Sequence, residues 1–261
     1  MSEVVAAAEI ELAEALADAA RGIIKGYFRQ PIAVDDKSDL TPVTIADREA
    51  EAAMRTLIEK RFPGHGIIGE EHGRLRAEAE SVWVLDPIDG TKSFISGIPL
   101  FGTLIALTRR GRPVLGIIDQ PILGERWLGA AGRATTLNGS PVRTRACAAL
   151  ANATLFSTAP ELMFGGADAA GFAALRRAVK LTRAGGDCYA YAQLASGFID
   201  LVVEGQLKPY DYCALVPVIE GAGGIITDWQ GHALDLASDG RVVAAGEPAL
   251  AAKARALLVG G

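Results

Sequence analysis

Two aspartates near the middle of the chain have a spacing suited to chemistry. Residues 82–85 form an apolar run typical of a buried strand, and Asp86 and Asp89 follow it. Because proline has no N–H for a strand ladder, Pro87 is expected to end the strand, leaving both carboxylates at its end. Two carboxylates three residues apart across a turn can face one point and offer the oxygen ligands that hard divalent cations take. The alternative is an ordinary turn, since Asp-Gly is among the commonest turn dipeptides.

Gly90 and Thr91 come next and are predicted to open a helix. The first turn of a helix has unpaired backbone N–H groups and the positive end of the helix dipole. An anion such as a phosphate group is therefore expected to bind there, beside the cations.

Carboxylates also stand at helix starts and strand ends elsewhere. Asp47 falls in the first turn of a helix predicted over residues 46–61, where a carboxylate also serves simply as a dipole partner. Glu70 and Glu71 follow a short apolar strand over residues 67–69, repeating the Asp86 arrangement, although a solvated turn would also tolerate them. Asp211 precedes an apolar helix predicted over residues 211–221, where helix capping is the alternative role.

The elements that must position these residues change in character along the chain. The first 28 residues are predicted to form an amphipathic helix, and residues 37–44 a polar loop. Residues 101–108, 113–119 and 125–130 are β-rich runs separated by turns, which indicate an antiparallel meander. After Cys147 the pattern becomes one of alternating strands and helices. We therefore predict an α+β subdomain over residues 1–147 and an α/β subdomain over residues 148–261, together one domain. The apolar face of the first helix is predicted to comprise Val5, Ala8, Leu12, Ala15, Leu16, Ala19, Ile23 and Tyr27.

Composition excludes several classes of protein. The 261 residues are 50% hydrophobic, enough for a substantial core, and a net charge of -5 without long charged runs disfavours nucleic-acid binding. No apolar run reaches the length of a membrane span, and the acidic start lacks the basic region of a signal peptide, so we predict a cytoplasmic protein. Three widely spaced cysteines argue against a disulfide framework and a zinc site. No serine nucleophile-elbow motif or histidine cluster supports a triad hydrolase.

Four motifs together resemble the inositol monophosphatase-like family of metal-dependent sugar and alcohol phosphatases. Residues 83–91, Trp-Val-Leu-Asp-Pro-Ile-Asp-Gly-Thr, are similar to the family's central signature, and residues 68–71, Ile-Gly-Glu-Glu, to its first acidic motif. Tyr210 and Asp211 with residues 220–224 resemble its C-terminal motif, although the family often has tryptophan where Tyr210 stands. Residues 39–44 with Asp47 fit its N-terminal element, so the resemblance covers nearly the whole chain.

Further segments look most like the histidinol-phosphatase branch of the family. They are residues 69–73, 100–106, 118–121 and 185–191. The function implied is magnesium-dependent hydrolysis of a phosphate monoester, with L-histidinol phosphate as substrate. One alternative is an inositol or other sugar monophosphatase, which would share all the metal ligands. A bisphosphate nucleotide phosphatase would need nucleobase contacts that we do not identify, and an inactive metal- or ligand-binding regulator would be free to lose its acidic ligands, all of which are present.

The resemblance also implies a fold and a set of metal ligands. The fold is a layered α/β sandwich, in the order α-β-α-β-α, of the inositol monophosphatase and fructose-bisphosphatase type. Glu70, Asp86 and the carbonyl of Ile88 are implied to bind one Mg²⁺. Asp86, Asp89 and Asp211 are implied to bind a second, in a site of two to three ions. Family members are commonly homodimers, so a homodimer is expected.

Roles toward the substrate follow from the same resemblance. Thr91 and Asp47 form a pair that orients and deprotonates the attacking water, with assistance from Glu70. Gly90 and Thr91 donate backbone N–H groups to the phosphate. Asp187 and Glu204 lie beside the leaving group, where carboxylates would favour a cationic one. The alternatives are that Asp187 caps the next helix and that Glu204 is a solvated strand end. The substrate-binding residues implied are Glu70, Asp89, Gly90, Thr91, Asp187, Glu204 and Asp211.

Overall fold

The computed structural model describes residues 4–36 and 42–260. Residues 37–41 lie outside the described part. They include most of the predicted loop, and Asp39 and Leu40 of the N-terminal motif. Among the described residues, no helix is both long and apolar enough to cross a membrane.

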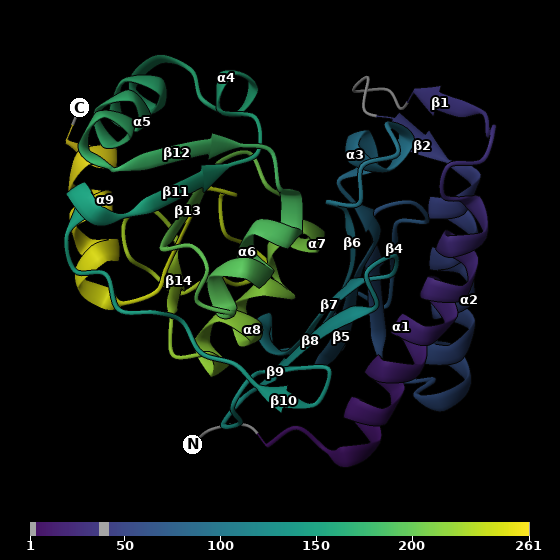
Figure 1. The fold of residues 1–261 in the computed structure, drawn as a ribbon. Helices are drawn as coiled ribbons and strands as arrows, with labels where there is room; N and C mark the ends of the chain where they lie inside the picture. Colours follow the sequence, from purple (N-terminus) through teal and green to yellow (C-terminus); the bar gives the residue numbers. More distant parts are fainter. Residues whose placement is uncertain (1–3, 37–41, 261) are drawn as a thin grey trace.

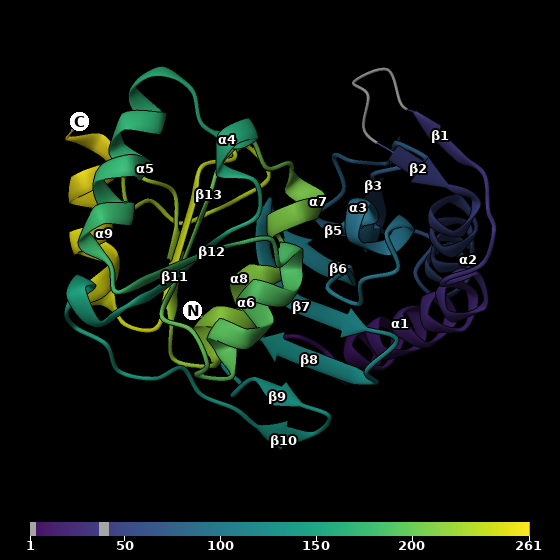
Figure 2. The same ribbon diagram turned by 45° about the horizontal axis from the view of Figure 1, so that its top comes forward.

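The chain folds into five layers, alternately of helices and sheet (Figure 1). Helices α1 (Ala7–Tyr27) and α2 (Ile45–Arg61) cover one face of an eight-stranded sheet. Helices α6 (Asp187–Ala195) and α8 (Leu215–Gly221) lie between that sheet and a five-stranded sheet, as Figure 2 also shows. Helices α5 (Gly166–Ala178) and α9 (Pro248–Val259) cover the outer face of the second sheet. The predicted α-β-α-β-α sandwich is therefore confirmed.

The first sheet has the strand order β10-β9-β8-β7-β6-β5-β3-β4. Strands β5 to β10 are antiparallel neighbours, as the predicted meander requires, and β3 runs parallel to β5. The strands are β3 (Gly66–Gly69), β4 (Arg74–Leu75), β5 (Ser81–Asp89), β6 (Gly102–Arg109), β7 (Arg112–Gln120), β8 (Glu125–Ala130), β9 (Thr136–Leu137) and β10 (Ser140–Pro141). A separate antiparallel pair, β1 (Val34–Asp36) and β2 (Pro42–Thr44), precedes α2.

The second sheet has the order β12-β11-β13-β15-β14, with β11 parallel to both its neighbours and β15 antiparallel to its own. Its strands are β11 (Thr154–Ser157), β12 (Leu181–Ala184), β13 (Leu201–Glu204), β14 (Ile225–Thr227) and β15 (Val242–Ala245). Short helical segments connect the longer elements: α3 (Thr91–Ile95), η1 (Leu150–Asn152), α4 (Pro160–Met163) and α7 (Pro209–Tyr212).

The buried face of α1 differs in part from the predicted one. Leu12 and Leu16 are buried as expected, but Ala8 and Ala15 are exposed. Glu9 is buried instead, because its carboxylate accepts two hydrogen bonds from Arg109, at 2.7 and 2.6 Å. Alanines occur on several faces of this helix, so their spacing does not identify the face that packs.

Strand β5 does not end at Pro87, as predicted, but continues to Asp89. Its register against β6 shifts between Asp86 and Asp89, which marks a β-bulge. Proline is tolerated at a bulge, where no ladder N–H is needed, and the Pro87 carbonyl still accepts a hydrogen bond from the Thr103 hydroxyl at 2.8 Å.

The predicted single helix over residues 211–221 is instead two helices, α7 and α8. Pro217 has no N–H to donate to the carbonyl of Cys213, the residue that caps α7, so one continuous hydrogen-bond ladder cannot form there. The break places Asp211 in a short helix of its own.

Candidate active site

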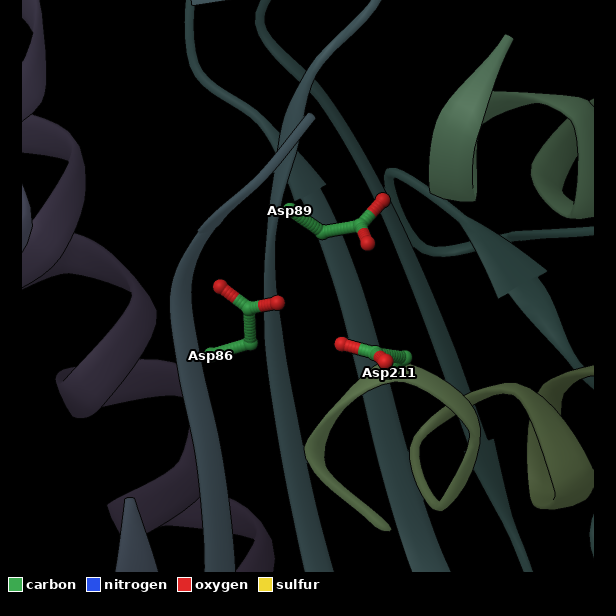
Figure 3. Close-up of side chains that lie close together, drawn as sticks. All are labelled: Asp86, Asp89 and Asp211. Carbon is green, nitrogen blue, oxygen red and sulfur yellow. The ribbon is translucent and has the colours of Figure 1, made fainter. Parts of the chain in front are cut away.

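Three carboxylates converge between the two halves of the chain (Figure 3). Asp86 and Asp89 come from the end of β5, and Asp211 comes from α7. One oxygen of each lies within 4.8 Å of the others. The structure thus brings together residues more than 120 positions apart in the sequence, as the metal-site prediction requires.

Backbone N–H groups hold each of these carboxylates in place. Asp86 accepts a hydrogen bond from the N–H of Ile88 at 3.0 Å, and Asp211 accepts one from the N–H of Lys208 at 2.7 Å. Asp89 accepts one from the N–H of Cys188, in the first turn of α6. Lys208, and not Asp211, is the N-cap of α7; Asp211 accepts the N–H of this N-cap residue from three positions later, and this contact is compatible with a ligand role.

Burial and mutual repulsion make this cluster electrostatically unfavourable when no cation is bound. Burial raises the pKa of Asp86 and Asp89 well above the usual range, and nearby carboxylates, including Glu70 for Asp86 and Asp187 for Asp89, raise it further. Burial also raises the pKa of Asp211 to about 7. Oxygen donors that repel one another at this distance fit a hard divalent cation, which would stabilise all three charged forms.

The cluster lies in a pocket of about 480 Å³. Nine of the ten predicted site residues line it: Glu70, Asp86, Ile88, Asp89, Gly90, Thr91, Asp187, Glu204 and Asp211. The tenth, Asp47, is fully buried and is not among the lining residues. Its distance from Glu70 is nevertheless short enough for Glu70 to raise its pKa, in addition to the larger effect of burial.

Gly90 begins α3 in a backbone conformation that side chains resist. Its φ is +89°, in the left-handed region, and a Cβ there would lie 2.8 Å from Cγ of Asp187. Glycine thus lets two neighbouring walls of the pocket approach closely. The hydroxyl of Thr91 donates to the Ile88 carbonyl at 3.1 Å. The predicted Thr91–Asp47 pair stays a prediction.

Only one carboxylate oxygen of Asp47 takes part in capping helix α2. Its Oδ2 accepts hydrogen bonds from the N–H and the hydroxyl of Thr44, at 2.9 and 2.6 Å, which completes a capping box. Its Oδ1 is buried and has no hydrogen-bond partner among the described residues. A buried carboxylate oxygen without a partner is costly, so a water or ligand proton at this position would stabilise it.

Asp187 and Glu204 line the same pocket. Glu204 is 3% exposed, which excludes the solvated strand end, and accepts hydrogen bonds from both the N–H and the hydroxyl of Thr158 and from the hydroxyl of Tyr191. Asp187 accepts a hydrogen bond from the hydroxyl of Ser93 at 2.9 Å, a contact outside its own helix. Burial raises the pKa of both groups, that of Glu204 to about 7.

Comparison with known proteins decides the family. The model of the inositol monophosphatase family matches residues 6–259. The chain belongs to the inositol monophosphatase family.

Relatives within the inositol monophosphatase family carry different names. The chain is 58% identical over 219 residues to "Bifunctional phosphatase IMPL2, chloroplastic" of Arabidopsis thaliana, covering 83% of this chain but only 63% of that protein. It is 38% identical over 237 residues to the histidinol-phosphatase of Chlorobaculum parvum, covering 90% and 92% of the two chains. A solved structure of an inositol monophosphatase from Zymomonas mobilis superposes with a TM-score of 0.89 and 49% identity, covering 97% and 99%. The family, but not the substrate, is thereby shown.

One residue that the sequence reasoning missed positions a loop of this inositol monophosphatase site. Glu51 was not singled out in the sequence, and it is fully buried. Its carboxylate accepts hydrogen bonds from the N–H groups of Glu71 and His72, at 2.7 and 3.1 Å, and from Arg55 at 2.7 Å. It therefore fixes the loop that follows β3 and carries Glu70. Gly69 is a sequence signal for this contact, because any side chain at position 69 would collide with the carboxylate of Glu51.

Three hydroxyl groups were also missed: that of Ser93 donates a hydrogen bond to Asp187, and those of Thr158 and Tyr191 donate to Glu204. Thr158 directly follows β11, a strand that the sequence reasoning did not predict. If that strand had been predicted, Thr158 would have been identified as a polar residue at the end of a strand. This is the same signal that drew attention to Asp86.

Proposed function

We propose that the protein is a magnesium-dependent histidinol-phosphatase that releases phosphate from L-histidinol phosphate. The observation that carries the proposal is a pair of carboxylates in the lining of the pocket: Asp187, which is half-buried, and Glu204, which is buried. Their hydrogen-bond donors are neutral hydroxyl and N–H groups, Ser93 for one and Thr158 and Tyr191 for the other.

A cationic leaving group matches this wall better than a neutral one. Histidinol phosphate carries an amine and an imidazole, both of which can be cationic near neutral pH. Since burial raises the pKa of Asp187 and Glu204, a bound cation would stabilise their charged forms and gain binding energy in return. Lys92, which lines the same pocket, lowers the pKa of Asp187 and so partly offsets its charge. A polyol would bring no counter-charge for the buried Glu204, which a buried site penalises.

The names of relatives support two substrates. A relative that covers nine tenths of the chain is called a histidinol-phosphatase, and a solved structure at 49% identity is called an inositol monophosphatase. Inositol monophosphate is therefore the second candidate, and it would use the same metal cluster.

We propose Mg²⁺ as the metal because every donor in the cluster is an oxygen. Asp86, Asp89 and Asp211 would hold it, with Glu70 and the carbonyl of Ile88 completing a site of two to three ions. The metal would supply charge neutralisation at the phosphoryl oxygens and a more acidic water.

The chain's own residues would orient the substrate and the water. The N–H groups of Gly90 and Thr91 would donate to phosphoryl oxygens at the start of α3. Two groups would orient the attacking water and accept its proton. One is the Thr91 hydroxyl, which in the structure donates to the Ile88 carbonyl, and the other is Oδ1 of Asp47, which has no hydrogen-bond partner among the described residues. Asp187 and Glu204 would bind the amine and the imidazole of the leaving group, and Glu70, Asp89 and Asp211 would complete the substrate contacts.

Phosphate release from histidinol phosphate, inositol monophosphate and adenosine bisphosphate, measured side by side, tests the proposal. We expect the highest kcat/KM with histidinol phosphate, and loss of activity in EDTA that added Mg²⁺ restores. A preference for inositol monophosphate would replace the histidinol assignment with the second candidate. No hydrolysis of any phosphate ester with Mg²⁺ would refute a phosphatase and favour a ligand-binding regulator.

Three broader expectations belong to the same proposal. The division into subdomains over residues 1–147 and 148–261 is supported by the two sheets, which lie on either side of that boundary in the sequence. A homodimer and a cytoplasmic location stay predictions. Sedimentation of the purified protein tests the first, and fractionation of the source cells tests the second.

A further inference from the structure

We propose that Ala159, Leu162 and Met163 form an apolar wall that binds the ring of the leaving group, and that Gln206 positions this wall. We call the three residues the α4 wall, since they lie on α4 or directly before it. The inference rests on the proposed function only in placing a leaving group in this pocket. It adds a selectivity for ring-bearing leaving groups that the carboxylates alone do not provide.

The α4 wall lines the pocket beside the two carboxylates of the leaving-group side. Leu162 is 65% exposed, although Phe164, which directly follows the wall, is buried. Leu207 lines the same pocket from the chain that follows β13. The leaving-group side therefore combines negative charge with apolar side chains, as a charged ring requires.

Gln206 ties the α4 wall to the chain that carries Glu204. Its side-chain amide donates to the backbone carbonyls of Leu162 and Met163, at 3.2 and 2.7 Å. Its own φ is +63°, a left-handed conformation that costs free energy for a residue with a side chain. Such strain persists where surrounding contacts over-determine a conformation, and ligand-binding segments are a common location.

The segment is also anchored from the core side. Phe164, 7% exposed, packs against Phe172 and Trp229 with ring centroids 4.7 and 5.5 Å apart. A Cβ at Gly205 would lie 3.0 Å from the Phe164 ring, so the two segments are in close contact. These contacts fix Phe164 in the core, whereas Leu162, two residues earlier, is exposed and lines the pocket.

The two kinds of contact select different parts of a leaving group. Asp187 and Glu204 would attract positive charge, whereas the α4 wall would gain energy only by burying an apolar surface, such as the face of an imidazole or phenyl ring. A polyol offers no such surface. The α4 wall should therefore favour an aryl phosphate, which has a ring and no positive charge, as well as histidinol phosphate.

The test compares Leu162→Ala with Leu123→Ala on three substrates: histidinol phosphate, phenyl phosphate and glycerol phosphate. Leu123 is a matched control, since it is 53% exposed in the turn between β7 and β8 and does not line the pocket. For Leu162→Ala we expect KM to rise roughly fivefold or more with the two ring substrates, with kcat little changed, and no change with glycerol phosphate. Leu123→Ala should change none of these values.

Gln206→Met keeps the length of the side chain and removes the donors to α4. If Gln206 acts by positioning Leu162, this variant should show the same selective rise in KM, and the double variant should lose no more than the larger single loss. Strictly additive losses would refute the positioning role.

Equal effects of Leu162→Ala on all three substrates, or no effect on any, would overturn the α4 wall. A wild-type preference for inositol monophosphate with a selective loss on phenyl phosphate would reject histidinol phosphate and retain the wall. Calorimetric binding of phenyl phosphate and glycerol phosphate with Ca²⁺ gives the same comparison without turnover, so an inactive enzyme still decides the question.

Discussion

Glu204 should make the metal-free protein less stable as the pH rises, and Glu204→Gln should remove that effect. Burial raises the pKa of Glu204 from 4.5 to about 7, against the opposing hydrogen bonds from Thr158 and Tyr191. The folded state therefore holds a proton that the unfolded state releases, and stability from this group is full below about pH 4.5 and lost as the pH rises through 7. At about 1.36 kcal/mol per pKa unit, the shift corresponds to roughly 3 kcal/mol.

Glutamine has no proton to lose at this position, and its amide can still pair with Thr158 and Tyr191. Relative to wild type, Glu204→Gln should thus gain roughly 3 kcal/mol in the free energy of unfolding between about pH 4.5 and 8. Urea denaturation in EDTA at pH 5, 6, 7 and 8, followed by tryptophan fluorescence, measures this difference.

Asp200→Asn provides the opposite control. Burial would raise the pKa of Asp200, but hydrogen bonds from Arg145 and from the N–H of Thr154 outweigh burial and hold it below its usual value. The stabilisation from the charged Asp200 is therefore fully present above the pKa of Asp200 in the unfolded state. It is lost only as the pH falls through the lower pKa of the folded state. The loss of unfolding free energy caused by Asp200→Asn should thus be constant from pH 5 to 8. A Glu204→Gln difference that is equally flat, or that favours wild type at high pH, would refute the reasoning.

Three further predictions concern catalysis. Asp86→Asn should nearly abolish magnesium-dependent turnover, because a metal ligand loses its charge. The variant should still fold, because the substitution removes a buried charge that repels its neighbours. A wild-type kcat of this variant at saturating Mg²⁺ would contradict the metal assignment. Thr91→Ala and Asp47→Asn should each lower kcat more than they raise KM, and strictly additive losses in the double variant would show that the two residues do not act as a unit. Asp187→Ala and Glu204→Ala should each lower kcat/KM for histidinol phosphate by roughly tenfold or more, while hydrolysis of phenyl phosphate changes little; equal losses on both substrates would indicate a structural role.

The carboxylate cluster was predictable because its signals are local. Asp89, Glu70 and Asp211 each stand where a strand ends or a helix begins, and the apolar runs beside them indicate those boundaries. The five layers followed from the resemblance, and the order of strands and helices in the sequence agreed with it. The strand ends and helix starts depend on residues within a few positions of one another, so a sequence displays them directly.

The parts that were missed depend on contacts between distant segments. Glu51 looks like any acidic residue on a polar helix until the loop at residues 70–73 folds onto it. Gln206 gives no sign in the sequence that it will donate to carbonyls more than 40 residues away. Neither arrangement has a characteristic spacing, because both are produced by packing of the layers.

The bulge in β5 brings Asp86 and Asp89 together although the predicted end of the strand was wrong. In a regular strand, residues three apart point to opposite faces, so Asp86 and Asp89 could not both face the pocket. Between them β5 advances three residues, from Asp86 to Asp89, while β6 advances two, from Leu104 to Gly102. The extra residue in β5 restores a common direction for the two carboxylates, and Pro87 lies inside this interval, where its missing N–H costs no ladder bond. Pro87, which was predicted to end the strand, is thus part of what allows the strand itself to present both carboxylates to one point in the pocket.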